Sequence, residues 1–508
     1  MLFFARDREY DLKTVQPGST SVYERKVAVV NRAMLDLGMG KYQWMVFGLS
    51  GLGWFMDVYW KQSINLIGPF VRMEFGIQQI AFLNVAKQAG SLIGAIFWPL
   101  TSDYIGRRPA FNITLALSCV TALVAAGSPS FAAIAILAGV IGFAIGGNQY
   151  VDSTIFIEFV PASHQFLLPM ATVFATLAQL MSVLIAWPLV TNYSCTPRLV
   201  AAHQCNFMNN LGWRYYLWTG GGLSIPMVIA RYLFHLLETP KYLLGRSRDA
   251  AAVSVVQTIA STNRNATWLT LDSLRAIDAE LYNTTTPRNT SPTTPTSSTR
   301  TLKHRLSPHK LPALFCTPKM ALSTTLVLFI WSTVGFGYTL FNSFLPFYLQ
   351  SQSSHPLSTQ TLFRTLAIQA ACGIPGSVLA GYAAELPRFG RKGTGCVACL
   401  GSAVFLFLFT RAQSDEAVLG YSCAVAFCIA VAHGLLYGYT SELFPAPIRG
   451  TGQGVVGLAS EAASLGAALV AAWVGLGERS VWVAAGCLTG AGCAFLGMPY
   501  EMRGRAAA

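Results

Sequence analysis

Ionisable side chains that lie within long apolar stretches are the residues of this sequence whose chemistry most needs an explanation. Asp57 follows two glycines and Trp54 in such a stretch, and Lys61 comes one helical turn later. A charged group at membrane depth is costly unless it is paired or hydrated, so each one is a candidate functional group. Asp57 is a candidate proton- or substrate-binding residue, and a neutralising ion pair with Lys61 is the alternative. Lys87, in the next apolar stretch, offers a cation either to an anionic substrate or to Asp57.

A second polar group interrupts a later apolar stretch. Asn148, Gln149 and Asp152 share one helix face at spacings i, i+1 and i+4. These side chains are candidates for contacting a substrate, and hydrogen bonding between helices is the alternative. His433 and Glu461 are further candidates, and a packed side chain with a satisfied hydrogen bond is the alternative for each.

The elements that must position these residues are membrane-spanning helices. Of the 508 residues, 53% are apolar and 11% are charged, whereas soluble domains average about a quarter charged. A run of about 20 apolar residues crosses a hydrocarbon core about 30 Å thick, and only a helix satisfies the backbone of such a segment in lipid. The sequence therefore predicts an all-α membrane protein with twelve transmembrane helices. The predicted spans lie near 43–68, 80–101, 109–128, 131–157, 166–190, 214–236, 320–349, 362–384, 393–411, 416–439, 452–476 and 481–498.

Six predicted spans precede a long polar segment and six follow it. The low-complexity part of this segment, 283–299, is nearly devoid of apolar residues, so we expect it to be disordered. The preceding stretch, 247–281, has the spacing of an amphipathic helix that could lie along the inner membrane face. The predicted organisation is an N-terminal segment over 1–42, a six-helix bundle over 43–236, a central loop over 237–319, a second six-helix bundle over 320–498 and a tail over 499–508.

The distribution of basic residues predicts the orientation in the membrane. With the N-terminus in the cytosol, 26 Lys and Arg residues lie in cytosolic segments and five lie on the opposite side. The positive-inside rule then places both termini in the cytosol. The net charge of +13 is explained by this topology and by anionic inner-leaflet lipid, so it requires no nucleic-acid partner. We expect a multi-pass protein of the plasma membrane, with a vacuolar or other endomembrane as the alternative.

The two sets of spans repeat the same pattern of loop residues. The loop after the second span carries Asp103, Gly106, Arg107 and Arg108, and the loop after the eighth carries Glu385, Arg388, Gly390 and Arg391. Glu158 follows the fourth span, and Glu442 with Arg449 follows the tenth. A duplicated six-helix unit explains this recurrence and predicts two pseudo-symmetric halves.

These loops resemble the motifs of the major facilitator superfamily. The loop 103–108 is similar to its G-x-x-x-D-R-x-G-R-R signature, with Tyr104 where arginine is usual. The segment 238–243 is similar to the PESPR-type motif of sugar porters, and 499–505 is similar to their PETKGR tail. The resemblance implies halves that rock about a central site and an inner gate held by loop contacts. Positive-inside anchoring with a tight turn at Gly106 is the alternative for these loops. The residues implied in gating are Asp103, Gly106, Arg107, Arg108, Glu158, Arg388, Gly390, Arg391, Glu442 and Arg449.

Shorter segments resemble particular groups within the major facilitator superfamily. The segments 142–148 and 158–161 resemble synaptic-vesicle-protein-two-related transporters, and 51–57 and 386–393 resemble fungal metabolite:proton symporter-like members. Gln179, followed by a leucine, is similar to the Gln-Leu pair of sugar porters and is therefore a candidate substrate contact. The Gln-Gln pair of hexose porters is replaced here, which argues against a hexose substrate.

The predicted outer loop between the fifth and sixth spans has its own chemistry. Cys195 and Cys205 lie on the side where a disulfide can persist, and free thiols are the alternative. Asn192 begins an Asn-Tyr-Ser sequon in the same loop and is the best-placed glycosylation site.

The residues and the resemblance together predict a secondary active transporter. It would move a small polar or organic-anion metabolite by alternating access, coupled to protons, and it would work as a monomer in the lipid bilayer. A non-transporting membrane sensor or vesicle-type protein on the same fold is the alternative. Seven scattered histidines supply no metal site, and no cofactor motif or clustered catalytic group predicts an enzyme.

Overall fold

The computed structural model describes residues 21–500 apart from 78, 106, 196–204, 235, 286–309, 343–344, 347–348, 350–357, 387–388, 413, 445 and 475–477. The side chains of 102–107 also lie outside the description. Most of the low-complexity stretch 283–299 falls in these gaps. Throughout the described ranges the regular structure is helical, as the predicted fold class requires.

A helix occupies each of the twelve predicted spans. In two spans the helix is interrupted, after Ile145 and after Met170. The first six spans are α2 (Lys41–Phe75), α3 (Ala81–Ile105), α4 (Arg107–Ala125), α5 with α6 (Phe131–Ile145 and Asn148–Phe159), α7 with α8 (Leu167–Met170 and Thr172–Tyr193) and α10 (Gly212–Leu233). The last six are α16 (Pro318–Asn342), α18 (Thr359–Ala383), α19 (Gly390–Phe409), α20 (Asp415–Leu443), α21 (Ala446–Val474) and α22 (Glu478–Leu496).

Nine of these spans, within the described residues, contain an 18-residue stretch that is apolar enough to cross a membrane. The other three, α2, α3 and α10, have 35, 25 and 22 residues, which at about 1.5 Å per residue is long enough to cross a bilayer. All three contain charged residues within the span, among them Asp57, Lys87 and Arg231. The chain is therefore an integral multi-pass membrane protein.

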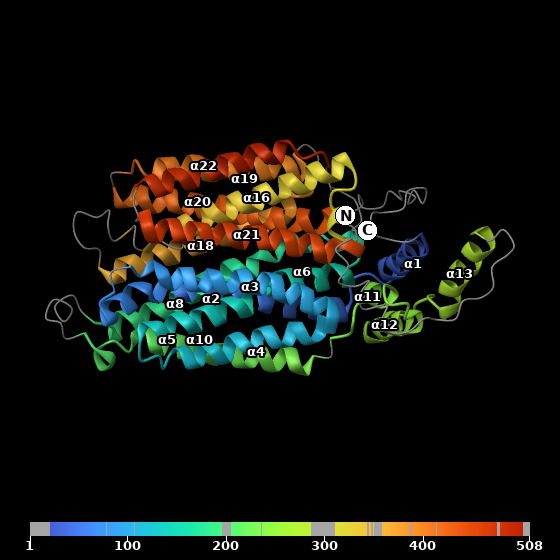
Figure 1. Ribbon diagram of the computed structural model, residues 1–508, viewed down its shortest axis with the longest axis horizontal. Coiled ribbons are helices and arrows are strands. Elements are labelled where there is room, and N and C mark those ends of the chain that lie inside the picture. The colour runs from blue at the N-terminus through green and yellow to red at the C-terminus, as the bar shows by residue number, and fades with distance from the viewer. Residues whose placement is uncertain are drawn as a thin grey trace.

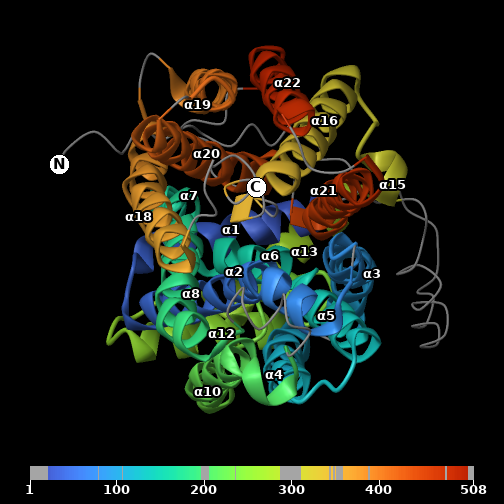
Figure 2. The same ribbon diagram turned by 90° about the vertical axis from the view of Figure 1, so that its left-hand side faces the viewer.

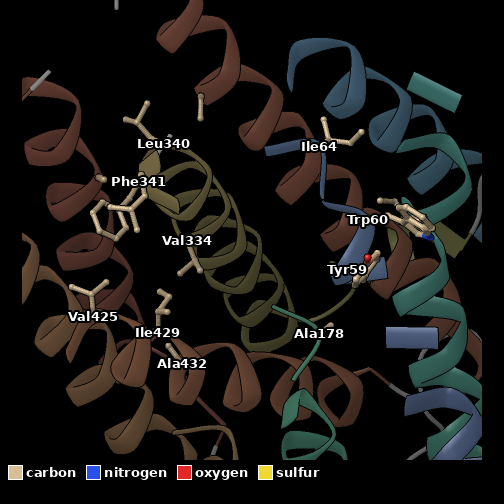
Figure 3. Close-up of a cluster of buried hydrophobic side chains, with 14 of the residues drawn as sticks. Tyr59, Trp60, Ile64, Ala178, Val334, Leu340, Phe341, Val425, Ile429 and Ala432 are labelled. Atoms are coloured by element: carbon tan, nitrogen blue, oxygen red, sulfur yellow. The ribbon is translucent and has the colours of Figure 1, made fainter. Parts of the chain in front are cut away.

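The spans form two groups that lie side by side. Figures 1 and 2 show α2–α10 in one half and α16–α22 in the other. The halves meet mainly where α3 packs against α21 and α8 packs against α18. Apolar residues from both halves form one cluster, part of which Figure 3 shows, with Tyr59 and Trp60 of α2 on one side and Val334 of α16 and Ile429 of α20 on the other.

Four further helices cover one end of the bundle, which we call the capped end (Figure 1). They are α1 (Ser21–Leu37), α11 (Pro240–Leu244), α12 (Asp249–Thr262) and α13 (Leu271–Thr285). The predicted amphipathic helix over 247–281 is thus two helices, because the chain turns at Asn263. The Asn263 side chain accepts a hydrogen bond from the backbone amide of Tyr42 at the start of α2 (2.9 Å). The apolar faces of α12 and α13 pack against α1.

Glycines bring α3 and α5 into backbone contact. A Cβ at Gly94 would collide with the Phe143 carbonyl, and one at Gly142 would collide with the Lys87 carbonyl. Such close packing of small residues is the usual means of helix association in membranes. This close contact holds the part of α3 that carries Lys87 against α5.

Candidate functional site

A cavity of about 180 Å³ lies between the two halves. Its walls are mixed, with aromatic rings, amides and a few charged side chains. The predicted site residues Lys61, Lys87, Gln149, Gln179 and His433 all line it. Trp54, Asn65, Gln88, Tyr338, Tyr437 and Glu461 line it as well. Asp57, Asn148 and Asp152 are buried and do not belong to the cavity wall.

One face of α2 carries a ladder of polar residues at four-residue intervals, namely Asp57, Lys61 and Asn65. Spacings of i, i+4 and i+8 place side chains above one another on a helix. The two carboxylate oxygens of Asp57 accept hydrogen bonds from the amide of Asn148, each at 3.1 Å. Asp57 is 2% exposed and, among the described residues, its carboxylate is in no ion pair.

The alternative pairings considered for Asp57 do not occur in this structure. Lys61 reaches across to the other half and forms an ion pair with Glu461 of α21, at 3.1 Å. Lys87 donates to the side-chain oxygen of Asn65, at 2.9 Å. Hydropathy could not indicate these partners, because Lys61 and Glu461 are 400 residues apart in the chain.

Asp152 does not line the cavity and instead forms a buried ion pair. Its carboxylate pairs with Arg231 of α10 at 2.7 Å, and both side chains are fully buried. The guanidinium also lies over the Phe111 ring, 3.6 Å from its centroid, and donates to the Phe111 carbonyl. A Cβ at Gly53 of α2 would collide with both members of the pair, so the glycine makes room for them. The arrangement corresponds to the helix–helix alternative for Asp152.

Neutral hydrogen bonds join the halves around the cavity. Tyr437 of α20 donates to the side-chain oxygen of Gln149 at 2.9 Å, and Gln179 donates to the Tyr338 hydroxyl at 2.6 Å. The Tyr338 ring packs edge-on against His433, whose Nδ1 lies 3.0 Å from the Ile429 carbonyl. A carbonyl is only an acceptor, so Nδ1 carries the proton and Nε2 is left as an acceptor.

Further contacts close the interface on the capped side of the cavity. Thr154 of α6 donates to Gln453 of α21 at 2.7 Å, and the same Gln453 amide donates to Ser441 at 2.8 Å. Thr176 of α8 and Ser377 of α18 are 3.3 Å apart. Because Thr154–Gln453 and Thr176–Ser377 join opposite halves, their separation is required for any opening of the cavity toward the capped end.

The loop motif of the second half forms a compact charge network. Arg391 forms ion pairs with Glu442 and, at 3.3 Å, with Glu385. Gly390 has φ of 56°, a left-handed conformation that favours glycine. Arg449 is fully buried and donates to the Phe444 carbonyl at 3.2 Å. The predicted gating residues Gly390, Arg391, Glu442 and Arg449 therefore lie together at the capped end.

The matching motif of the first half is described only in part. Gly106 and the side chains of Asp103 and Arg107 lie outside the described residues, as does Arg388 of the second-half motif. Glu158 is buried at the end of α6, and the Arg108 backbone amide donates to the Glu238 carboxylate at 3.4 Å. An anion at the start of α4 is favoured by the helix dipole.

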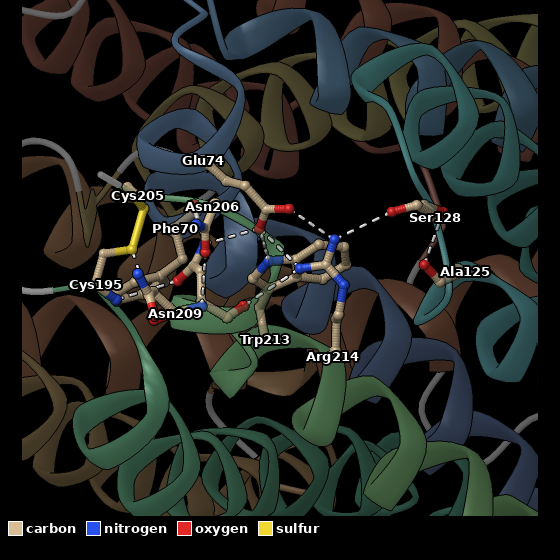
Figure 4. Close-up of polar contacts among 11 residues, drawn as sticks. Phe70, Glu74, Ala125, Ser128, Cys195, Cys205, Asn206, Asn209, Trp213 and Arg214 are labelled. Carbon is tan, nitrogen blue, oxygen red and sulfur yellow. Dashed lines mark hydrogen bonds and ion pairs between the residues drawn. A yellow bond between two sulfur atoms is a disulfide. The ribbon is translucent and has the colours of Figure 1, made fainter. Parts of the chain in front are cut away.

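The end opposite the cap is held by a second buried charge cluster (Figure 4). Glu74 of α2 pairs with Arg214 of α10 at 2.7 Å and also accepts from Trp213 at 3.0 Å. Cys195 and Cys205 are joined by a disulfide with Cα atoms 5.8 Å apart. Asn192 is exposed near the end of α8.

Sequence reasoning missed Asn65, Gln453 and Glu74. The four-residue spacing after Asp57 and Lys61 was a signal for Asn65. For Gln453 and Glu74 there was no comparable signal, since each bonds to a residue on a distant span.

Two halves of membrane-spanning helices around a cavity with polar, charged and aromatic walls have the architecture of a membrane transporter. The chain belongs to the Major Facilitator Superfamily, whose family model matches residues 44–465. The siderochrome iron transporter 1 of Ceriporiopsis subvermispora is 39% identical over 489 residues, covering 96% of this chain and 92% of that protein. The synaptic vesicle 2-related protein of Xenopus laevis is 26% identical over 46% of this chain and 40% of its own length. These relatives confirm the resemblance to fungal and synaptic-vesicle-related members.

Among solved structures, the E. coli proton:xylose symporter XylE bound to 6-bromo-6-deoxy-D-glucose superposes with a TM-score of 0.68 at 16% identity, covering 92% of this chain and 98% of the symporter.

Proposed function

We propose that this protein is a proton-coupled secondary transporter that moves a small polar or organic-anion metabolite by alternating access. The observation that carries the proposal is the cavity between the halves, whose mixed walls are bridged by Lys61–Glu461 and closed toward the capped end by Thr154–Gln453. Rocking of the halves would break the capped-side contacts and expose the same cavity to the other face. A single chain supplies both halves, so the working unit is a monomer.

Asp57 is the proposed proton-binding residue. Its carboxylate is buried next to the cavity-lining Lys61 and is held by one neutral amide. Burying a carboxylate without a cation is costly, and a bound proton removes that cost. The carboxylate is thus suited to carry a proton in one part of the transport cycle and to release it in another.

The capped end is proposed to face the cytosol. It contains α1, α11, α12 and α13, which belong to the segments that hold most of the basic residues. The disulfide then lies on the outer face, where oxidising conditions preserve it. The exposed Asn192 is on the same face and is the proposed glycosylation site. The plasma membrane is the proposed location.

The lining of the cavity favours a polar or anionic metabolite, because Lys87 and the amides of Gln149 and Gln179 all line it.

Reconstitution in vesicles tests the function directly. Purified protein would be screened for accumulation of carboxylates, sugars and phosphate with and without an inward proton gradient. We expect gradient-driven accumulation of at least one small solute and its loss in Asp57→Asn. Asp415→Asn, an exposed change at the start of α20, is the matched control and should behave as the parent protein. Accumulation of no solute would favour a non-transporting sensor.

A further inference from the structure

Among the described residues, six charged side chains lie at or beside the cavity, five of them buried and Lys61 partly exposed, and four of the six neutralise one another. Asp152 pairs with Arg231 at 2.7 Å and Glu461 pairs with Lys61 at 3.1 Å. Asp57 and Lys87 remain, and each is held only by a neutral amide among the described residues. With both ionised, the group as a whole has no net charge.

Lys87 is the charge available to a ligand. It is 2% exposed, lines the cavity and donates to Asn65 at 2.9 Å. An ammonium has three donors, so two remain for a bound molecule. Glu461 lies within electrostatic range of Lys87, but its carboxylate is engaged by Lys61. A buried cation without a counter-ion is strongly stabilised by an anion that enters beside it.

Asp57 and the residue that binds Lys87, Asn65, both lie on α2 but at different depths. Asn65 lies eight residues after Asp57, about 12 Å along the α2 axis. The charged groups that face Asp57 are Lys61 on α2, Asp152 on α6 and Arg231 on α10, with the Tyr437 hydroxyl on α20. The segments of α5 and α8 carry no Asp, Glu, Lys, Arg or His. The neighbouring cations are therefore engaged with other carboxylates, and Asp57 is the carboxylate left to exchange a proton.

We infer that the cavity binds one small monocarboxylate on Lys87 together with one proton on Asp57, so that the loaded site is electrically neutral. The inference rests on the proposed transport function and names its substrate charge and stoichiometry. An anion without the proton would leave one uncompensated negative charge inside the membrane, and a proton without the anion would leave one positive charge. Either state is disfavoured in a poorly polarisable interior. The proton and the anion are therefore bound and carried as a pair.

The remaining walls suit an apolar body on the carboxylate. Trp54 from one half and Trp331 from the other flank Tyr437, with ring centroids 4.7 and 4.8 Å away. The two Trp rings are inclined to the Tyr437 ring by 49° and 75°, and together the three rings form an aromatic surface on the capped side of the cavity. A monocarboxylate with a small flat or aliphatic body would use both this surface and the two free donors of Lys87.

Uptake into vesicles under separately controlled pH and voltage tests the stoichiometry. Labelled benzoate and lactate serve as probes, with glucose and choline as neutral and cationic comparisons. We expect a monocarboxylate to accumulate with an inward proton gradient, one proton per anion, and a valinomycin-imposed potential to change the initial rate by less than about twofold. Strong dependence on potential, or transport of glucose or choline alone, would overturn the inference while leaving the transport function intact. Transport of no probe and no other solute would contradict the transport function itself.

Variants at Lys87 separate a binding role from a structural one. We expect Lys87→Gln to raise the KM for the carboxylate at least tenfold, and Lys87→Arg to restore most of the affinity because it keeps the charge. Asp57→Asn should still exchange carboxylate across the membrane but lose the response to the proton gradient. Lys319→Gln, an exposed charge loss at the start of α16, is the control and should be silent. An unchanged KM in a folded Lys87→Gln protein, judged by an unaltered melting temperature, would refute the assignment.

Discussion

At the scale of single residues, the stability of the first half depends on where its buried charges find partners. Arg231 and Asp152 are both fully buried, and the guanidinium also rests on Phe111. Such a pair adds little net stability, yet separating its members leaves two uncompensated charges in an apolar interior. The space that the pair occupies exists because residue 53 on α2 has no side chain.

Gly53→Ala should therefore destabilise the protein. The added methyl group would force Arg231 and Asp152 apart, and the cost should approach the 3–5 kcal/mol expected when a buried pair is broken, to within about a factor of two. Thermal unfolding in detergent measures the effect. Gly48→Ala, five residues earlier on the same helix with open space at its Cβ position, is the control. It should be neutral or slightly stabilising, because alanine is the better helix former. Equal melting temperatures for the two variants would contradict this reading of Gly53.

At the scale of elements, three helices of the capped end are joined by one lysine. Lys26 of α1 bonds to Asp249 of α12 at 2.5 Å and to Asp278 of α13 at 2.7 Å. Burial lowers the pKa of the Lys26 ammonium, but its bonds to the two carboxylates outweigh burial and raise the pKa above its usual value. One lysine thus joins three helices whose apolar faces already meet.

Lys26→Met should loosen α1 from α12 and α13 at neutral pH, by about 1–2 kcal/mol for two partly buried ion pairs. Because the folded pKa is the higher one, the stabilisation is fully present below the unfolded pKa of about 10.4 and is lost as the pH rises through the folded value. The difference in melting temperature between parent and variant should stay constant from pH 7 to about pH 10 and shrink above it. A difference that already vanishes near pH 8 would contradict the assignment of Lys26.

The disulfide between Cys195 and Cys205 stabilises the loop that leads into α10. It closes a loop with a sequence separation of 10, for which chain entropy predicts about 3 kcal/mol. The double change of both cysteines to serine should lower the melting temperature accordingly, whereas Cys316→Ser, at an exposed free thiol, should not. Intact mass before and after reduction checks that the bond is present. An unpaired mass in protein from the secretory route would exclude it.

At the scale of the whole molecule, the structure is closed toward the capped end and its halves are joined by a few specific bonds. Gln453 is central among them, since it bonds both Thr154 of the opposite half and Ser441 of its own. Each neutral hydrogen bond is worth about 1 kcal/mol net. Small changes at this residue should therefore shift the balance between closed and open states without unfolding either half.

Gln453→Ala should raise the population open toward the capped end by roughly fivefold, the change that about 1 kcal/mol produces. Spin-label distances between the capped ends of α6 and α21 measure this population. Thr219→Val is the control, because Thr219 bonds only within its own helix and is exposed. An unchanged distance distribution in Gln453→Ala would show that closure resides in other contacts.

From the sequence, the position of the functional residues within the membrane could be predicted better than the side chains with which they pair. Long apolar runs placed Asp57, Lys61 and Lys87 inside the membrane, and the cavity lies there. Hydropathy carries no information on how each helix is rotated, so the pairing of Lys61 with Glu461 could not be derived. The same limit applies to the cap, where helical periodicity continued past Thr262. The chain turns there because the Asn263 side chain bonds to the start of α2, a tertiary contact that periodicity does not report.

The neutral character of the hydrogen bonds that join the two halves has a consequence for the conditions under which the protein works. Gln149–Tyr437, Thr154–Gln453 and Thr176–Ser377 join uncharged groups. Dissolved ions screen charges over about 8–10 Å at physiological salt, but they scarcely affect bonds between buried amides and hydroxyls. The contribution of these three contacts to closure is therefore the same in dilute and in concentrated electrolyte. A change in cellular salt under osmotic stress would therefore not alter the contribution of these hydrogen bonds to the equilibrium between the closed and open states.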